Sequence, residues 1–191
     1  KTETERKEVA LNPRLPCLVL GGSTAQSFAD VSRNANLDFL SGIIIANNQS
    51  HLIHGYGNSN FGPDHSLTRF ELLKVALASN CVGSSSSNPH PNTTFTDVPK
   101  DNSELSLVIG EAYARGIIKG IDGKFFPNQA VSNAEMFKIL LAASTYFQNG
   151  EPVAPLPLTV KGVTDASFAQ YIEKAYQLGL FTLPANQTFD Q

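Results

Sequence analysis

The chain has 191 residues, with 14 lysines and arginines against 17 aspartates and glutamates, for a formal net charge of −3. No stretch gathers basic residues, so the composition excludes the positive surface that nucleic acid or an anionic membrane surface requires. The apolar runs, such as residues 42–46 and 139–143, are far shorter than the roughly 20 residues that span a bilayer, and we expect no membrane span.

Residues 1–27 fit no repeated element and are interpreted as an N-terminal arm or the end of a preceding region. The abundance of Asn, Ser and Thr is typical of an exported protein, and the only two cysteines are Cys17 and Cys81. In an oxidising compartment this pair closes a loop of about 65 residues, which the loop-entropy model values at roughly 4 kcal/mol. We predict a Cys17–Cys81 disulfide; the alternative is two unrelated buried thiols.

An internal repeat organises the rest of the chain. Residues 67–78 match residues 131–142 at a constant offset of 64. Two signposts precede both copies in the same order, namely Phe28-Ala29-Asp30-Val31 or Phe95-Thr96-Asp97-Val98, and then Phe61-Gly62-Pro63 or Phe125-Phe126-Pro127. The repeat predicts a first unit (28–79), a second unit (95–144) and the first half of a third unit (162–191). Linkers at 80–94 and 145–161, rich in proline or serine, separate them.

Each unit is predicted to be helix, turn, helix. In the first unit the first helix is the longer one, with an insertion near residues 47–51, and the second helix begins at Thr68. In the second unit a helix from about residue 102 to 115 ends at Gly116, and the next helix begins at Ser132. Thr68 with Glu71, and Ser132 with Glu135, form capping boxes in which hydroxyl and carboxylate bond the first amides of the helix.

Apolar residues recur at helical spacing in all three units. In the second unit the first-helix stripe is Leu105, Val108, Ile109, Ala112 and Tyr113; in the third it is Phe168, Tyr171, Ile172, Ala175 and Tyr176. The second helices are predicted to bury Leu72, Val75, Ala76 and Ser79, or Met136, Ile139, Leu140 and Ala143. Since so short a helix pair cannot bury its own stripes, the units must pack on each other as one all-α domain.

Three aspartates stand at the entrance to the first helix of a unit: Asp30, Asp97 and Asp165. We interpret them as N-caps or turn acceptors, because a short carboxylate accepts hydrogen bonds from nearby amides.

The second unit resembles a complete repeat of the S-layer homology family. The resemblance is carried by four motifs in order: Phe95-Thr96-Asp97-Val98-Pro99, Ala114-Arg115-Gly116-Ile117-Ile118-Lys119-Gly120, Asp122-Gly123-Lys124-Phe125-Phe126-Pro127-Asn128 and Ser132-Asn133-Ala134-Glu135. The first unit is a looser match, with Thr68-Arg69-Phe70-Glu71 in place of the family's Thr-Arg-Ala-Glu. The third matches in its first half only.

The resemblance implies a pseudo-threefold helical bundle with grooves between its units. It also implies a place on the bacterial cell surface, where such modules hold exported proteins by binding a wall-linked polysaccharide or peptidoglycan-linked polymer, often acidic and pyruvylated. The family's arginine in Thr-Arg-Ala-Glu commonly lines those grooves. Arg69 keeps it, while Asn133 replaces it in the second unit, and these two residues are the candidate ligand-binding positions. Only a guanidinium is a two-pronged partner for a carboxylate, so at most one groove keeps this feature.

Two questions remain open from the residues. Arg69 either contacts a saccharide or carboxylate ligand, or it is solvated or forms a salt bridge between units. The chain either anchors a protein to the wall or is a structural segment of a surface layer, sheath or filament, contacting copies of itself or other surface proteins.

The sequence favours no chemistry beyond binding. His51 and His54 stand three residues apart, with His65 further along the chain, but a pair of imidazoles without a nearby carboxylate or thiolate is a poor metal site. No nucleophile, base and orienting group occur together. We therefore expect no catalytic residue, metal or cofactor.

Overall fold

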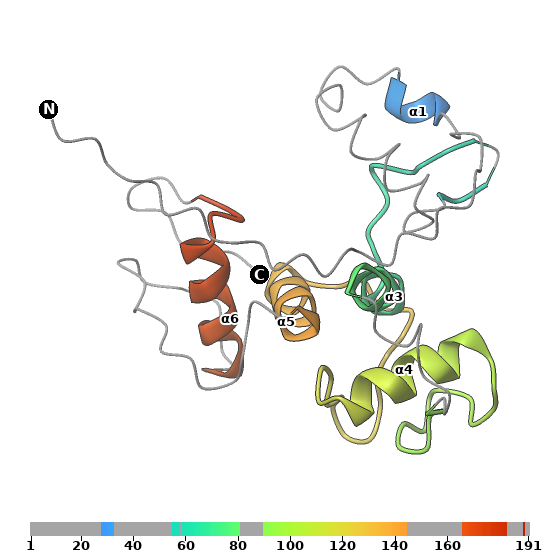
Figure 1. Ribbon diagram of the computed structural model, residues 1–191. Helices are drawn as coiled ribbons and strands as arrows, with labels where there is room; N and C mark the ends of the chain where they lie inside the picture. Colours follow the sequence, from blue (N-terminus) through green and yellow to red (C-terminus); the bar gives the residue numbers. More distant parts are fainter. Residues whose placement is uncertain are drawn as a thin grey trace, which may run out of the picture.

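The computed structural model describes residues 28–32, 55–57, 59–80, 90–144, 166–182 and 189. These residues form five helices (Figure 1): α1 (Ala29–Ser32), α3 (Arg69–Ser79), α4 (Glu104–Ala114), α5 (Asn133–Ala143) and α6 (Ala166–Gln177). The described part has isolated β-bridges and no strand, so the predicted all-α class is confirmed. The Cys17–Cys81 pairing, Asp165, His51 and His54 lie outside the described residues.

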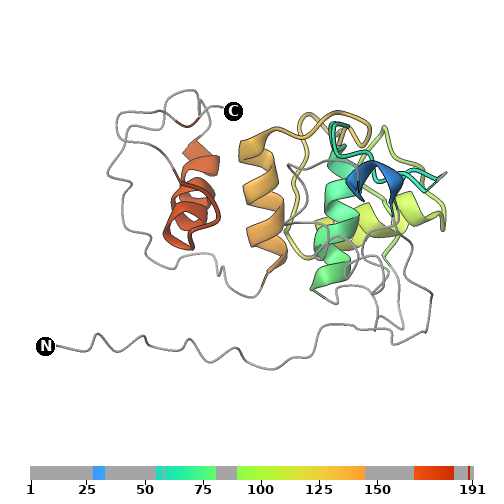
Figure 2. The ribbon, with the colours of Figure 1, turned by 90° about the horizontal axis from the view of Figure 1, so that it is seen from above.

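The helices pack in a regular order. Helix α4 packs on α3, α5 packs on α3, and α6 packs on α5. Figure 2 shows α3, α5 and α6 side by side with α5 in the middle, while α4 crosses α3. The first helix of each later unit therefore lies on the second helix of the unit before it.

This order explains why the predicted stripes of the second helices are partly wrong. Helix α3 buries Leu72 and Ala76 as predicted, but Leu73 and Leu77 are buried as well and Ser79 is exposed. Helix α5 directs Ile139 and Ala143 into the core around α3, whereas Phe137 and Leu141 belong to a second core against α6. A helix with neighbours on two sides buries more than the single stripe that one-faced periodicity predicts.

Two aspartates hold equivalent segments of the first and second units. Asp97 accepts from the amides of Phe125 (2.9 Å) and Phe126 (2.7 Å). Asp30 accepts from the amides of Phe61 (2.9 Å) and Gly62 (2.7 Å). Each carboxylate thus joins the start of its unit to the segment before the second helix.

Asp97 does not cap α4, the long helix that follows it. Helix α4 is capped by Ser103, whose hydroxyl accepts from the amide of Ser106. Of the two predicted roles, the contacts of Asp97 correspond to a turn acceptor.

Two aromatic rings also meet, tilted to each other, beside each aspartate contact. Ring centroids are 5.9 Å apart for Phe95 and Phe125, and 5.6 Å apart for Phe28 and Phe61. Phe95 and Phe125 lie fully buried in the core around α3. Phe28 and Phe61 form a separate small cluster with Val31.

We predict that Asp97→Asn lowers the free energy of unfolding by about 1–2 kcal/mol at neutral pH, because the amide bonds lose their charged acceptor. Burial opposes ionisation of Asp97, but the amides of Phe125 and Phe126 outweigh it and lower the pKa below its ordinary value of 3.8. The folded state therefore binds fewer protons than the unfolded state, and stability falls as pH drops from about 4 through the lowered pKa. Urea unfolding between pH 6 and pH 3 should show a weaker acid dependence in Asp97→Asn. An unchanged acid dependence would contradict a stabilising role for the hydrogen bonds that Asp97 accepts.

Candidate functional site

The start of α3 is bonded to the second unit through its backbone. The amide of Arg69 donates to the carbonyl of Gln129 (2.9 Å), and that of Phe70 donates to the carbonyl of Pro127 (3.1 Å). In return, the amide of Val131 donates to the carbonyl of Leu67 (2.9 Å). The first amides of a helix have no partner within it, so the segment before α5 completes α3.

Capping boxes are present at the start of both second helices. The Thr68 hydroxyl accepts from the amide of Glu71, whose carboxylate accepts from the amide of Thr68 (2.8 Å). The same reciprocal pair joins Ser132 and Glu135, with 3.0 Å from the Ser132 amide to Glu135 Oε2. These contacts fix the position of both glutamates.

Arg69 lies in the contact between the two units and is 8% exposed. Its Nε donates to the carbonyl of Phe125 at 2.9 Å, and its Nη1 donates to Oε1 of Glu135. The guanidinium carbon also lies 4.9 Å from the centroid of the Phe125 ring. Of the two alternatives left open by the sequence, the structure has the inter-unit salt bridge, and it compensates a cation placed at a helix N-terminus.

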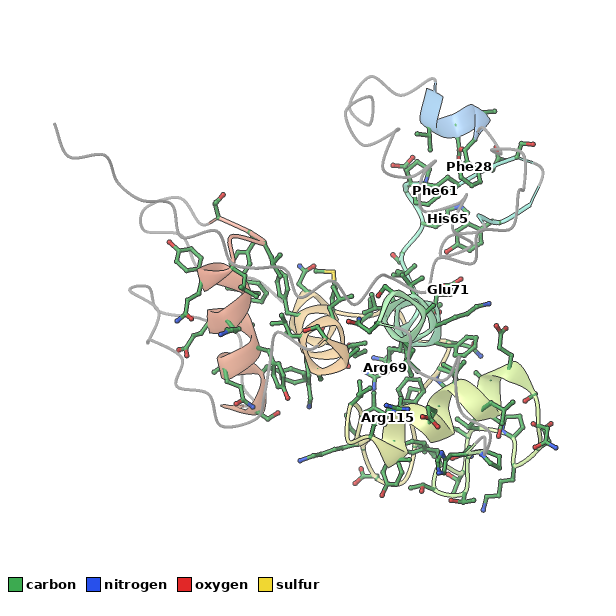
Figure 3. The ribbon with its side chains drawn as sticks, in the orientation of Figure 1. Phe28, Phe61, His65, Arg69, Glu71 and Arg115 are labelled. Atoms are coloured by element: carbon green, nitrogen blue, oxygen red, sulfur yellow. The ribbon has the colours of Figure 1, made fainter. Side chains whose placement is uncertain are left out.

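The Glu135 carboxylate therefore has two functions. Oε2 caps α5 through Ser132, and Oε1 pairs with Arg69 of the preceding unit. The equivalent Glu71 instead has a hydrogen bond from Tyr56 and lies near His65. Burial opposes its ionisation, but the Thr68 and Tyr56 hydrogen bonds outweigh it and lower the pKa of Glu71. Figure 3 shows Glu71 on the side of α3 nearer His65 and Arg69 on the side of the second unit.

A groove with a volume of about 220 Å³ lies beside this salt bridge. Its wall is formed by the start of α3, residues 117–121, α5 and the start of α6. Arg69 and Glu135 line it together with Lys119 and Lys138, and apolar side chains such as Ile139 and Phe168 complete it. Lys138 Nζ lies 4.7 Å from the centroid of the Phe168 ring.

The groove carries an excess of positive charge. Three cations and one carboxylate line it, and Arg69 and Glu135 neutralise each other as a pair. Lys119, which is exposed, and Lys138 are the other two cations of its wall. Such a site favours an anionic ligand with some apolar surface.

Sequence analysis predicted one of the residues that line the groove and did not predict the two lysines. Arg69 was singled out by its motif, and it does line the groove. Asn133 is exposed at the first position of α5 and is not among the described lining residues, so its role in ligand binding stays a prediction. Lys119 belongs to the Arg115–Gly120 motif, but no pattern marks Lys138, whose place depends on α6 packing against α5.

The described part contains no cluster of three or more His, Cys, Asp or Glu residues that could hold a metal ion. None of the helices in that part is both long enough and apolar enough to cross a membrane.

Comparisons with known proteins match two segments of the chain to one family. The family model described as "S-layer homology domain" matches residues 27–73 and 94–137. The chain is similar to a "Surface layer protein" of Brevibacillus choshinensis, with 30% identity over 112 residues, covering 58% of this chain and 10% of the relative. It is also similar to a "Middle cell wall protein" of Brevibacillus brevis, with 30% identity over 139 residues, covering 71% of this chain and 12% of the relative. The chain therefore spans about a tenth of the length of these relatives.

We predict that Arg69→Met lowers the free energy of unfolding by about 3 kcal/mol or more, because it leaves Glu135 without its partner in a poorly solvated contact. Arg69→Lys should recover only part of the loss, since one ammonium cannot reproduce the two-pronged geometry. Urea unfolding measures both.

The matched control is Lys74→Met, which removes the exposed pair with Glu104 (2.8 Å) that also joins α3 to another helix. It should cost less than about 1 kcal/mol. Equal losses for Arg69→Met and Lys74→Met would show that the buried salt bridge is not what joins the units.

Proposed function

We propose that this chain, which carries two repeats of the S-layer homology family, anchors an exported protein to an acidic polymer of the cell wall through the groove beside Arg69. The family repeats and the surface-layer and cell-wall relatives indicate a cell-surface, wall-anchoring module at the extracellular surface. We further propose that the polymer is an acidic, pyruvylated polysaccharide. Anchoring by binding this polymer requires no catalytic step.

The charge of the groove is the observation that carries the proposal. Lys119 and Lys138 lie around an apolar wall that includes Ile139 and Phe168. A carboxylate on a sugar can pair with either ammonium while the carbon skeleton contacts the apolar wall.

In this proposal Arg69 shapes the groove more than it binds the polymer. Its Nε and Nη1 are already engaged by Phe125 and Glu135, so an incoming carboxylate would have to compete with a buried partner. Anion binding falls mainly to the lysines. Asn133 adds no charge, so we assign the second unit no equivalent contact.

The proposal concerns the anchoring function of this chain alone. Because the chain spans about a tenth of its relatives, what the whole protein carries to the wall is outside the proposal. The division into an N-terminal arm (1–27), two units, two linkers and a third half-unit also remains a prediction.

The test is co-sedimentation of the chain with purified, protein-free cell walls. Replacing both Lys119 and Lys138 by Gln should weaken binding by at least about tenfold, because each charge-assisted contact contributes on the order of 1.5 kcal/mol or more. Binding of the wild-type chain should weaken as salt is raised. The control is Lys100→Gln, an exposed lysine that is not among the described groove residues, and it should bind as wild type.

Undiminished wall binding by the double variant would contradict the proposal. Assembly of the chain into ordered arrays without walls, together with no sedimentation on walls, would instead support the structural role in a surface layer.

A further inference from the structure

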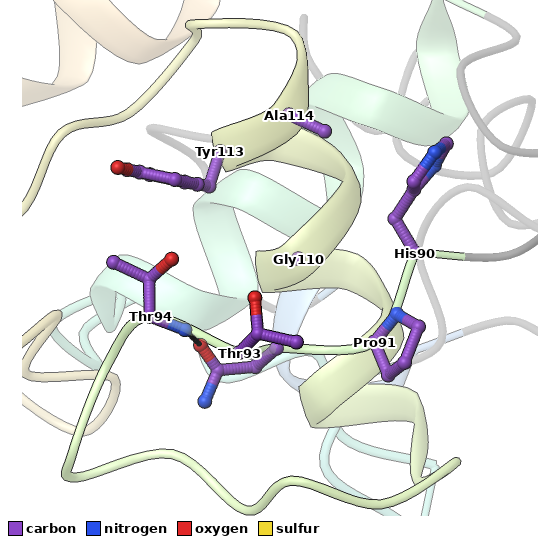
Figure 4. A pocket seen from close by; sticks show the side chains of 8 residues that line it. His90, Pro91, Thr93, Thr94, Gly110, Tyr113 and Ala114 are labelled. Atoms are coloured by element: carbon purple, nitrogen blue, oxygen red, sulfur yellow. Dashed lines mark hydrogen bonds between the residues drawn. The ribbon is translucent and has the colours of Figure 1, made fainter.

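A second hollow lies within the second unit, between α4 and the segment of residues 90–94. Its volume is about 210 Å³, and Figure 4 shows Tyr113 and Ala114 on one side of it and Pro91, Thr93 and Thr94 on the other. We propose that this hollow binds one neutral sugar ring, as a site separate from the charged groove.

Tyr113 provides an aromatic wall that is both exposed and fixed. The stripe of the first helix predicts Tyr113 in the core, but the residue is 43% exposed. Its ring meets the buried Phe95 edge to face, with centroids 5.3 Å apart and planes at 81°. A ring held in this way can offer a face to the C–H groups of a sugar with little loss of side-chain entropy.

The opposite wall is held against α4 by close backbone contact. A Cβ at Gly110 would lie 2.0 Å from the carbonyl oxygen of His90, so the absent side chain lets the segment lie directly on the helix. The Asn92 carboxamide then fixes the turn by accepting from the amides of Thr94 (3.1 Å) and Phe95 (2.8 Å). The hollow is therefore formed before any ligand arrives.

Polar groups at the edge of the hollow suit hydroxyl ligands. Thr93 and Thr94 are exposed, and each hydroxyl can both donate and accept. The His90 ring is oriented by Glu111, whose Oε2 lies 2.8 Å from Nδ1. Because Nδ1 is engaged, Nε2 is the ring nitrogen left for a ligand.

The charge around the hollow favours a neutral ligand. Glu111, whose side chain is 8% exposed, accepts from Nε of Arg115 at 2.6 Å, so this carboxylate is balanced. Among the described lining residues, the ionisable side chains are those of His90 and Tyr113. This differs from the groove, where the lysines leave an excess of positive charge.

The inference rests on the proposed function only for the source of the sugar, namely a polymer of the cell wall. Binding of a small neutral sugar can be measured without any wall. The two sites can therefore fail independently.

The experiment titrates the whole chain with the neutral disaccharide of N-acetylglucosamine and follows tyrosine ring and alanine methyl signals by NMR. We expect saturable shifts at Tyr113 and Ala114, with a dissociation constant on the order of 1 mM. Tyr113→Ala should weaken binding at least about tenfold, whereas Tyr113→Phe, which keeps the ring, should stay within about threefold. Tyr56→Ala removes another exposed tyrosine, 48% exposed, and should bind as wild type.

A second variant, Ala114→Leu, fills the hollow without removing a contact and should also abolish the shifts. Circular dichroism checks that both variants keep their helices. The Lys119/Lys138 double variant should retain the disaccharide shifts even where it loses wall binding. Unchanged binding in Tyr113→Ala and Ala114→Leu, or shifts confined to the groove residues, or no saturable shift at all, would overturn the proposal.

Discussion

The packing of this protein depends on one buried contact, in which Arg69 of the first unit meets Phe125 and Glu135 of the second. Phe125 is the centre of this contact, because its amide is held by Asp97 while its carbonyl and ring face the guanidinium. Glu135 caps α5 and pairs with Arg69 using different oxygens. Phe125 and Glu135 are thus each held by a contact within their own unit, which reduces the entropy lost in forming the salt bridge.

This contact also decides which residues are available for a ligand. Nε and Nη1 of Arg69 are occupied by the Phe125 carbonyl and the Glu135 carboxylate. Arg69 therefore lines the groove but contributes less than the lysines to binding a ligand. The two other cations of the groove are Lys119, on the segment of residues 117–121, and Lys138, on α5. In our proposal the arginine is structural and the lysines bind, so fold stability and wall affinity are separable properties of one groove.

Local sequence patterns predict the local structure of this chain well. The constant offset of 64 located the second helices, and the Thr-x-x-Glu and Ser-x-x-Glu spacings gave their first residues. The partners of Arg69 and Tyr113 could not be predicted in the same way. Arg69 meets a carboxylate 66 residues away, and Tyr113 is exposed although it stands on an apolar stripe. Both outcomes depend on which helix packs on which, and helical periodicity carries no information about that order. The capping boxes gave one further indication. Each box uses one carboxylate oxygen of its glutamate, so the other oxygen is available for a partner outside the helix.

Native-state hydrogen exchange of the α3 and α5 amides tests the central claim most directly, because it reports the opening free energy of each helix separately. If the Arg69–Glu135 contact joins the two units, the most protected amides of α3 and α5 should share one opening free energy in the wild-type chain. In Glu135→Gln, which keeps the shape of the side chain but removes its charge, the two helices should open with different free energies. Separate opening already in the wild-type chain, or common opening that survives Glu135→Gln, would contradict the account.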